Sequence, residues 1–328
     1  MAWICNPHPV YPNFFSLLVG KTAQARKTTA YEFALKLLQE ATGRIRESKI
    51  KQLYGIASIE GLAAAMSDGD GGFRVLCVED EFRSLITKSG SGNIIPRLTE
   101  LYNCPQTFQI NTRKNALAVA EPFVCLLSAT TQAWFEDSLS VKDAIGGFLN
   151  RWLLFGGEAS KVLPFPPEVA KPAWDELIIE LSVAVNSARG GYELSEAAKL
   201  IYSDFYTALR SAPPSPATAR MDLHAKKLGL LYAVLAQHAQ IEVDDISAGI
   251  AVAKYCAATA EPLALRLDSC PRKRKEERLL AALRTGPMSA REVYRKLHIS
   301  AAELVGLAGS LSEVGQITRV GDRYAVTE

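Results

Sequence analysis

Four short apolar segments, each the length of a β-strand, limit the fold that this chain of 328 residues can adopt. They are residues 14–19 (FFSLLV), 74–78 (RVLCV), 123–127 (FVCLL) and 152–155 (WLLF). Residues 28–42, between the first two, repeat apolar side chains with a helical period, which predicts a helix with Phe33, Leu37 and Ala41 among the side chains on its apolar face. Strands that are apolar along their whole length are buried on both faces, as in a parallel sheet covered by helices. The sequence therefore predicts an α/β core over residues 1–163.

A second predicted domain follows a proline-rich break at residues 163–167 (LPFPP). Over residues 164–270 the apolar side chains recur with the helical period, and no segment alternates as a strand would. We therefore expect this domain to be a helical lid on the core.

A third predicted domain, residues 271–328, follows the basic segment 270–275 (CPRKRK), which we expect to be a linker. Ser289 and Ser300 are positioned to cap its second and third short helices, with Glu303 completing a capping box. A hairpin with the turn Gly321-Asp322 should follow. Three short helices and then a hairpin is the order of a winged helix.

Composition excludes several other classes of protein. No segment approaches the roughly 20 apolar residues that a membrane-spanning helix needs, and residues 1–9 lack the basic and apolar regions of a secretory signal. The six cysteines are scattered without a CxxC pair, which favours reduced thiols over a disulfide framework or a zinc site. We expect a cytoplasmic protein with no membrane partner.

The strongest chemical signal lies in residues 20–29 (GKTAQARKTT), at the end of the first strand and the start of the first helix. This is the context of a phosphate-binding loop, in which backbone N–H groups hold the phosphates. Lys27 would place its ammonium group on them, and Thr28 or Thr29 would hold Mg²⁺. Arg26 stands where the usual loop has glycine, and it adopts a left-handed conformation less cheaply. A basic turn between a strand and a helix is the alternative interpretation.

Carboxylates end the second apolar strand, where Glu79, Asp80 and Glu81 stand in a row. A nucleotide-hydrolysing site needs one acid at such a strand end to hold Mg²⁺, and often a second to orient water. The alternative interpretation is a charged turn.

Two further residues are placed to act on a phosphate. Thr130, at the end of the third strand, could sense the terminal phosphate, although a Ser/Thr cap for the next helix fits equally well. Arg151 stands beside the fourth strand and could serve a neighbouring subunit as an arginine finger, or form a structural ion pair.

Taken together, these segments resemble an uncharacterised family of P-loop ATPases, the helicase-like part of phage and plasmid primase–helicase proteins. The family pattern Val-Gly-x-Thr-x-x-Ala-Arg-Lys-Gly-Thr is matched by residues 19–29, with Thr28 in place of the second glycine. Other family patterns are matched by residues 58–62 (SIEGL), 79–82 (EDEF), 147–151 (GFLNR) and 219–228 (ARMDLHAKKL). The resemblance covers about residues 13–260.

The resemblance implies a RecA-like P-loop core that binds ATP and Mg²⁺. Its implied nucleotide-binding residues are Gly20, Ala25, Arg26, Lys27, Thr28, Thr29, Thr130 and Arg220. It further implies that Thr29 and Glu79 hold Mg²⁺ and that Glu60 activates water, although Glu60 could equally be a helix-capping acid. Arg151 would act on a neighbouring subunit, which implies a homo-oligomer such as a ring.

The function implied is an ATP-dependent helicase or translocase of a phage or plasmid replication system. Family members often carry an upstream primase-like region; we expect none here, and a separate primase chain is one way to supply it. The alternative function is a nucleotide-binding, non-hydrolysing adaptor or regulator that binds DNA.

The net charge of +2 divides unevenly along the chain. Residues 271–328 hold eleven basic and seven acidic side chains, so the rest of the chain has a net charge of −2. The third helix of this basic domain, residues 301–313, has no Lys, Arg, Asn or Gln to read base edges. We expect DNA, single-stranded in a helicase, to be contacted through its backbone, with a protein-interaction role or a packing module as alternatives.

Overall fold

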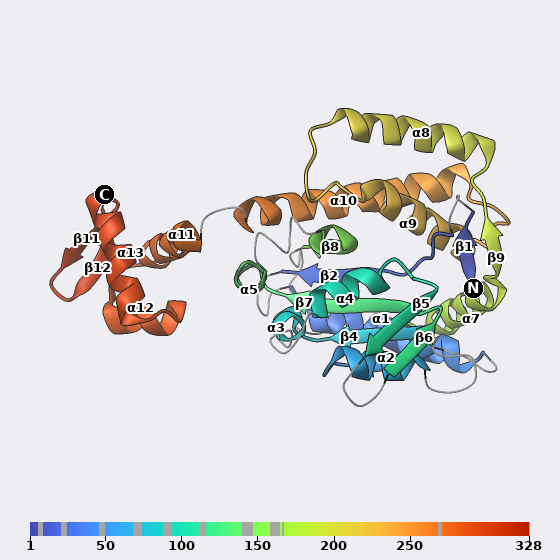
Figure 1. The fold of residues 1–328 in the computed structure, drawn as a ribbon, viewed down its shortest axis with the longest axis horizontal. Helices are drawn as coiled ribbons and strands as arrows, with labels where there is room; N and C mark the ends of the chain where they lie inside the picture. Colours follow the sequence, from blue (N-terminus) through green and yellow to red (C-terminus); the bar gives the residue numbers. More distant parts are fainter. Residues whose placement is uncertain are drawn as a thin grey trace. The chain divides into compact units, whose positions relative to one another are not determined.

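A five-stranded parallel sheet forms the centre of the larger part of the protein (Figure 1). Its strands are β2 (Phe15–Val19), β3 (Ile50–Tyr54), β4 (Arg74–Glu79), β7 (Val124–Thr130) and β8 (Trp152–Gly156). They lie in the order β3-β4-β7-β2-β8, and every neighbouring pair is parallel. The predicted α/β core and its four apolar strands are confirmed. Strand β3, which sequence reasoning missed, is a polar strand at the edge of the sheet.

The protein divides into two compact units, Met1–Ala264 and Leu265–Glu328. The computed structural model describes residues 1–5, 9–20, 25–45, 50–67, 74–87, 94–111, 116–139, 147–157, 165, 167–267 and 271–327. The sequence predicted three domains, whereas the helices that follow residue 167 share a hydrophobic core with sheet residues such as Leu153 and Phe155. That shared core is the physical reason why the sheet and these helices form one unit.

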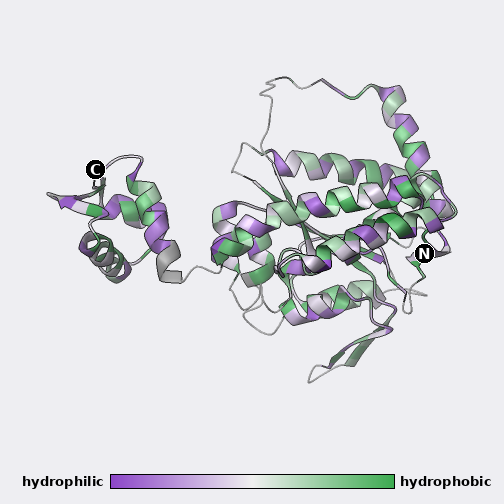
Figure 2. Ribbon diagram, turned by 90° about the horizontal axis from the view of Figure 1, so that it is seen from above, coloured by the Kyte–Doolittle hydropathy of each residue, from purple (hydrophilic) through white to green (hydrophobic). Residues whose placement is uncertain are grey.

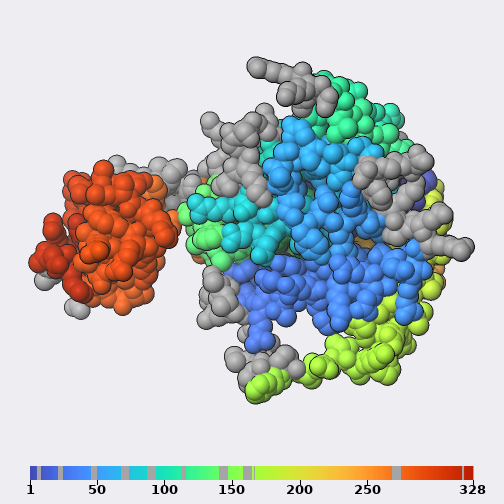
Figure 3. Space-filling model, turned by 90° about the horizontal axis from the view of Figure 1, so that it is seen from below, coloured from blue at the N-terminus to red at the C-terminus, as the bar shows by residue number. Residues whose placement is uncertain are grey.

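Helix α1 (Lys27–Gly43) packs on one face of the sheet. Its Tyr31 and Leu35 contact Val78 and Ala129. Helix α7 (Lys171–Ser187) lies against α1 (Figure 3). At this contact the rings of Phe33 and Trp174 are 4.8 Å apart. The sequence predicted that Phe33 would be among the buried side chains of α1; it is 47% exposed because it faces α7 and not the sheet.

Shorter elements surround the sheet in the first unit. They are α2 (Ile59–Ser67), α3 (Phe82–Thr87), α4 (Ile94–Leu101), the antiparallel pair β5 (Thr107–Asn111) and β6 (Ala116–Ala120), α5 (Gln132–Ser138) and the 3₁₀ turn η2 (Leu149–Arg151). On the face opposite α1, Phe82 lies between the rings of Phe135, Phe148 and Trp152. This aromatic cluster holds α3, α5 and η2 together.

The predicted helices after residue 167 are present as α7, α8 (Glu196–Ser211), α9 (Met221–Leu235) and α10 (Val243–Leu267). Figure 2 shows hydrophobic and hydrophilic residues interspersed along the helices of this unit. The prediction that this region contains no strand was wrong. Strand β9 (Gly190–Tyr192) pairs in parallel with β1 (Ala2–Ile4). A three-residue strand with two glycines shows no alternation in the sequence, and its partner is far away along the chain.

The second unit contains three helices and a small antiparallel sheet. The helices are α11 (Pro271–Leu283), α12 (Ala290–Leu297) and α13 (Ala301–Glu313), and the strands are β10 (Met288–Ser289), β11 (Ile317–Val320) and β12 (Arg323–Val326). Ser289 and Ser300 each form the predicted N-cap, in both cases as a full capping box. The prediction of a linker at residues 270–275 was wrong from Pro271 onward, because α11 begins there.

None of the helices in the described ranges is both long and apolar enough to cross a membrane.

A close helix crossing in the first unit generates a stability prediction. A Cβ on Gly249 of α10 would lie 2.5 Å from Ala225 O and 2.6 Å from Gly229 N, both backbone atoms of α9. We expect Gly249→Ala to lower the free energy of unfolding by about 2–3 kcal/mol, because backbone atoms cannot move aside. Gly43→Ala, at an open helix end, is the matched control and should change it by less than about 1 kcal/mol. Urea denaturation measures the free energy of unfolding of both variants. Equal values for Gly249→Ala and Gly43→Ala would contradict the close contact between α9 and α10.

Candidate functional site

The carboxyl-terminal edge of the sheet brings together the strand ends on which the sequence placed a phosphate site. Val19 pairs with Thr130 on one side and with Gly156 on the other. The Gly20 N–H donates to Thr130 O at 3.2 Å, so the loop leaves the sheet next to the end of β7. Glu79 ends β4, one strand further along.

The loop that follows β2 returns onto its own start. Residues 21–24 lie outside the described residues, but both ends of the loop are in place. A Cβ on Gly20 would lie 2.5 Å from the Cβ of Ala25, so only glycine fits there. The Lys27 Nζ donates to Gly20 O at 2.9 Å, and burial lowers the pKa of this lysine. Gly20, Ala25 and Lys27 are therefore brought together as the sequence predicted.

Arg26 precedes α1 in the left-handed conformation, with φ 44° and ψ 38°. A residue with a side chain adopts this conformation at a cost of about 1–2 kcal/mol. The sequence indicated that Arg26 is a costly substitute for glycine, yet the chain makes the glycine-like turn with it.

The amino-terminal end of α1 suits an anion. The N–H groups of a first helical turn have no acceptor within the helix, and the helix dipole makes that end positive. The first turn of α1 contains no acidic residue, and the Arg26 side chain does not cap it. Phosphate oxygens are the ligands that such an end binds best.

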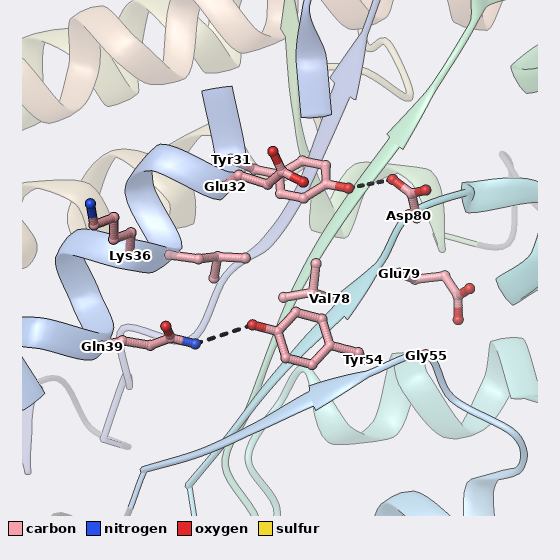
Figure 4. Close-up of a pocket in the computed structure, with 10 residues that line it drawn as sticks. Tyr31, Glu32, Lys36, Gln39, Tyr54, Gly55, Val78, Glu79 and Asp80 are labelled. Carbon is pink, nitrogen blue, oxygen red and sulfur yellow. Dashed lines mark hydrogen bonds between the residues drawn. The ribbon is translucent and has the colours of Figure 1, made fainter. Parts of the chain in front are cut away.

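A hydrogen-bonded pair that the sequence did not indicate connects α1 to β4. The Tyr31 hydroxyl donates to Asp80 Oδ1 (Figure 4). Burial and this hydrogen bond raise the pKa of Tyr31 to about 12, while a side-chain hydrogen bond with Thr28 acts in the opposite direction. The structure thus gathers Thr28, Tyr31 and Asp80. Thr29, the predicted Mg²⁺ ligand, is exposed.

Glu79 faces away from α1 because strand residues alternate. Val78 packs against α1, so the next side chain lies on the opposite face of β4. Its carboxylate accepts the Ile56 N–H at 3.0 Å, and it is 8% exposed. The Glu79 carbonyl accepts the Ser128 hydroxyl at 2.7 Å. The two acids of this strand end therefore lie on different sides of β4, as Figure 4 shows.

A cavity of about 570 Å³ opens beside this edge, between α1 and the ends of β3 and β4. It is lined by Tyr31, Glu32, Leu35, Lys36, Gln39, Tyr54, Gly55, Val78, Glu79 and Asp80 (Figure 4). Glu60 does not line it. That residue is exposed in the first turn of α2, where the Ser58 hydroxyl accepts the Gly61 N–H and caps the helix.

Thr130 is buried at the end of β7, and its hydroxyl donates to Thr131 O at 3.2 Å. The helix cap is the neighbouring Thr131, whose hydroxyl accepts the Trp134 N–H. The capping interpretation therefore applies to Thr131 and leaves Thr130 beside the loop.

Arg151 and Arg220 lie at the opposite edge of the sheet. Arg151 ends η2, directly before Trp152, which pairs with Phe15 at the start of β2. The length of β2, about 13 Å, separates that edge from Gly20. Arg151 donates to Gly147 O within its own chain and is 8% exposed. Neither arginine lies at the loop of its own chain, and an arginine that serves a neighbouring subunit must be more exposed than Arg151.

These two arginines belong to a buried group of cations around Tyr102, which the sequence did not reveal. The Lys227 Nζ lies 3.9 Å from the ring centre, and the two guanidinium carbons lie 5.9 Å from it. Burial lowers the pKa of Lys227 to about 7, and burial lowers that of Arg151 to about 10. His224 joins the group, with Nε2 3.0 Å from Asn150 O and Nδ1 3.4 Å from the Tyr102 hydroxyl. We call these residues the Tyr102 cluster.

The residues at the carboxyl-terminal edge fit a bound nucleotide and its Mg²⁺. A loop closed on glycine, a lysine over it, an acid-free helix start and carboxylates at β4 supply the right donor and acceptor types. Among the described residues, no group of three or more His, Cys, Asp or Glu side chains is arranged to hold a metal by itself.

Comparison with known proteins adds no assignment. No model of a known protein family matches the chain, and no curated protein matches it.

The turn at Arg26 generates a prediction about the loop. We expect the Arg26→Gly variant to be about 1 kcal/mol more stable to unfolding than Arg26→Ala, because glycine adopts positive φ without strain. Both variants lose the arginine side chain, so the difference between their free energies of unfolding reports the cost of the left-handed backbone conformation. Urea denaturation is the measurement, and a more stable alanine variant would contradict the left-handed turn.

His224 generates a pH prediction. Burial is the largest cause that lowers its pKa, from 6.5 to about 4, while the hydrogen bond to Asn150 raises it. The folded state therefore disfavours the proton, and stability falls as the pH drops from 6.5 towards 4. Between pH 7.5 and 5 we expect the wild type to lose about 2 kcal/mol more than His224→Gln. Denaturation curves at both pH values test this; equal losses would show that the imidazole is not held neutral.

Proposed function

We propose that this chain is a P-loop ATPase with a RecA-like core that couples ATP hydrolysis to movement on DNA. The observation that carries the proposal is the start of α1. Lys27 folds back over Gly20 at the carboxyl end of a buried parallel strand, and Arg26 makes the left-handed turn before it. A basic turn of another kind would need neither this close packing nor an acid-free helix end.

In this proposal the phosphates lie against the start of α1. The N–H groups of its first turn and the loop backbone hold them, and the Lys27 ammonium exchanges its contact with Gly20 O for a phosphate oxygen. A lysine that already lies over the loop needs little rearrangement to do so. Thr130, beside the loop exit, is placed to contact the terminal phosphate.

The two acids at the end of β4 have different roles in this proposal. Bound Mg²⁺ neutralises charge on the phosphates during their transfer. Asp80 and Thr28 both hydrogen-bond with Tyr31, so in this proposal Mg²⁺ lies on their side of β4. Thr29 is the residue that matches the metal-binding hydroxyl of the family pattern. Glu79 is fixed by the Ile56 N–H on the other face of β4, next to the cavity, where it can orient water. Glu60 is exposed and has the weaker geometry for that role.

The second unit is the DNA-binding part of the proposal. As a winged helix it would use exposed basic side chains, which are Arg291, Arg295, Lys296, Arg319 and Arg323. Lys275 is engaged by Glu303, whose pKa this contact lowers to about 2. The side chains of residues 272–274, also predicted to meet phosphates, lie outside the described residues. Helix α13 offers no base-reading side chain, so backbone contact without sequence preference is the expected mode.

The assembly belongs to the proposal as well. A ring of subunits would let an exposed arginine of one chain approach the phosphates bound by its neighbour. Arg220 is more exposed than Arg151, so it is the better arginine for a contact in trans. A primase chain from the same phage or plasmid replication system is the proposed functional partner.

The alternative is a nucleotide-binding adaptor that does not hydrolyse ATP. The position of Glu79 favours it, because the carboxylate is buried and accepts a backbone N–H from Ile56. If Glu79 stays buried when nucleotide binds, the attacking water does not reach its carboxylate. Binding would then change the conformation of the chain without turnover.

ATPase measurements with and without single-stranded DNA test the proposal. We expect DNA-stimulated hydrolysis in the wild type and a loss of at least about a hundredfold in Lys27→Ala, because the ammonium group stabilises charge on the phosphates. Lys171→Ala, an exposed lysine at the start of α7, is the matched control and should hydrolyse ATP like the wild type.

Two results would decide against hydrolysis. Equal background rates in all samples, with ATP still raising the melting temperature of the wild type but not of Lys27→Ala, would establish the adaptor instead. Equal rates with no effect of ATP on melting would exclude nucleotide binding altogether.

A further inference from the structure

We infer that the Tyr102 cluster, at the amino-terminal edge of the sheet, is a second anion-binding site whose ligand is an oxyanion of phosphate chemistry. It lies on the edge opposite Gly20, so within one chain it is separate from the proposed nucleotide site, and binding there does not require hydrolysis.

Three cationic side chains converge on one buried ring. Lys227 comes from α9, Arg151 from η2 and Arg220 from the residue before α9, and all lie within 5.9 Å of the Tyr102 ring centre. Burial lowers the pKa of Arg151 and of Lys227 most, and the nearby charge of Arg220 acts in the same direction on both. Like charges are gathered in this way at sites that bind an opposite charge.

No carboxylate among the described residues forms an ion pair with any of the three cations. Lys227 donates instead to Asn13, at 3.1 Å to the carbonyl and 2.7 Å to Oδ1, and both acceptors are neutral. The nearest acid along α9, Asp222, pairs with Arg210 at 3.0 Å. Since buried charges are normally paired, the cluster holds an excess of positive charge that an anion would neutralise.

Arg151 also has a hydrogen-bond donor left over. Its side chain is more than nine-tenths buried, and its Nε has no hydrogen-bond partner. The neighbouring Asn150 and Trp152 likewise each carry a buried polar side-chain atom without a partner. A buried guanidinium N–H with no acceptor is destabilising, and a bound oxyanion would supply the missing acceptor.

Helix α9 adds its positive end to the cluster. Its 15 residues begin at Met221, directly after Arg220, and no side chain caps that end. His224 lies in the first turn and Lys227 in the second, so the helix dipole and the cationic side chains act on the same place. Arg220 is partly exposed, so this side chain of the cluster is in contact with solvent.

Guanidinium, ammonium and helix N–H donors together match a tetrahedral oxyanion with several acceptor oxygens. Free phosphate and the phosphodiester of a single DNA strand share this chemistry. The two sources are therefore separate arms of the same test.

The test is calorimetric titration of full-length protein at constant ionic strength in chloride. Lys27→Ala is used as the background, so that the proposed nucleotide loop does not contribute. We expect inorganic phosphate to bind, and Arg220→Gln in that background to bind at least about tenfold more weakly, as the loss of one charged hydrogen bond implies. Arg151→Met should act in the same direction. Lys199→Gln, which removes an exposed cation from the neighbouring helix α8, is the charge-matched control and should bind like the background.

A short single-stranded oligonucleotide forms the second arm, titrated into the same four proteins. A parallel loss of DNA affinity in Arg220→Gln identifies the phosphodiester as the source, and an unchanged DNA affinity identifies free phosphate. No phosphate binding to Lys27→Ala, or equal affinities in Arg220→Gln and Lys199→Gln, overturns the inference. Because Arg220 is partly exposed, its variant should fold even if Arg151→Met does not, and circular dichroism checks both.

Discussion

The parallel pairing of β2 with β7 and β8 decides which residues this protein can bring together. The register places Gly20, Thr130 and Gly156 at one edge of the sheet and Asn13, Arg151 and Trp152 at the other. A slip of one residue would exchange the faces of Phe15 and Leu18 and bury the wrong side chains. Both chemical regions of the first unit therefore depend on the burial of a few apolar side chains on β2.

The sequence predicted those elements whose own residues form a recognisable pattern. Apolar strands, helices with a clear period and the two serine caps of the second unit are all present. Strands β3 and β9 escaped prediction because each is stabilised by a distant partner and not by its own composition. Phe33 was assigned to the buried face of α1 because α7, which it contacts, is more than 130 residues further along the chain.

The same distinction holds for the candidate site. Gly20, Lys27 and the acids of β4 follow or precede strands, so their position at one edge could be predicted from the sequence alone. Tyr31 could not, because its role arises from a hydrogen bond to Asp80 that only the packing of α1 on β4 creates. Arg151 and Arg220 match family patterns, but a pattern does not say at which end of a strand a side chain lies.

The pairing of β1 with β9 has a consequence for how the chain acquires this structure. Ala2 and Gly190 are partners in one ladder, so the first strand must remain without its partner while the intervening residues are synthesised. At a synthesis rate of about 5–20 residues per second, that interval is roughly 10–40 s. An unpaired strand edge is prone to join the wrong partner, so β1 is exposed to mispairing during this interval.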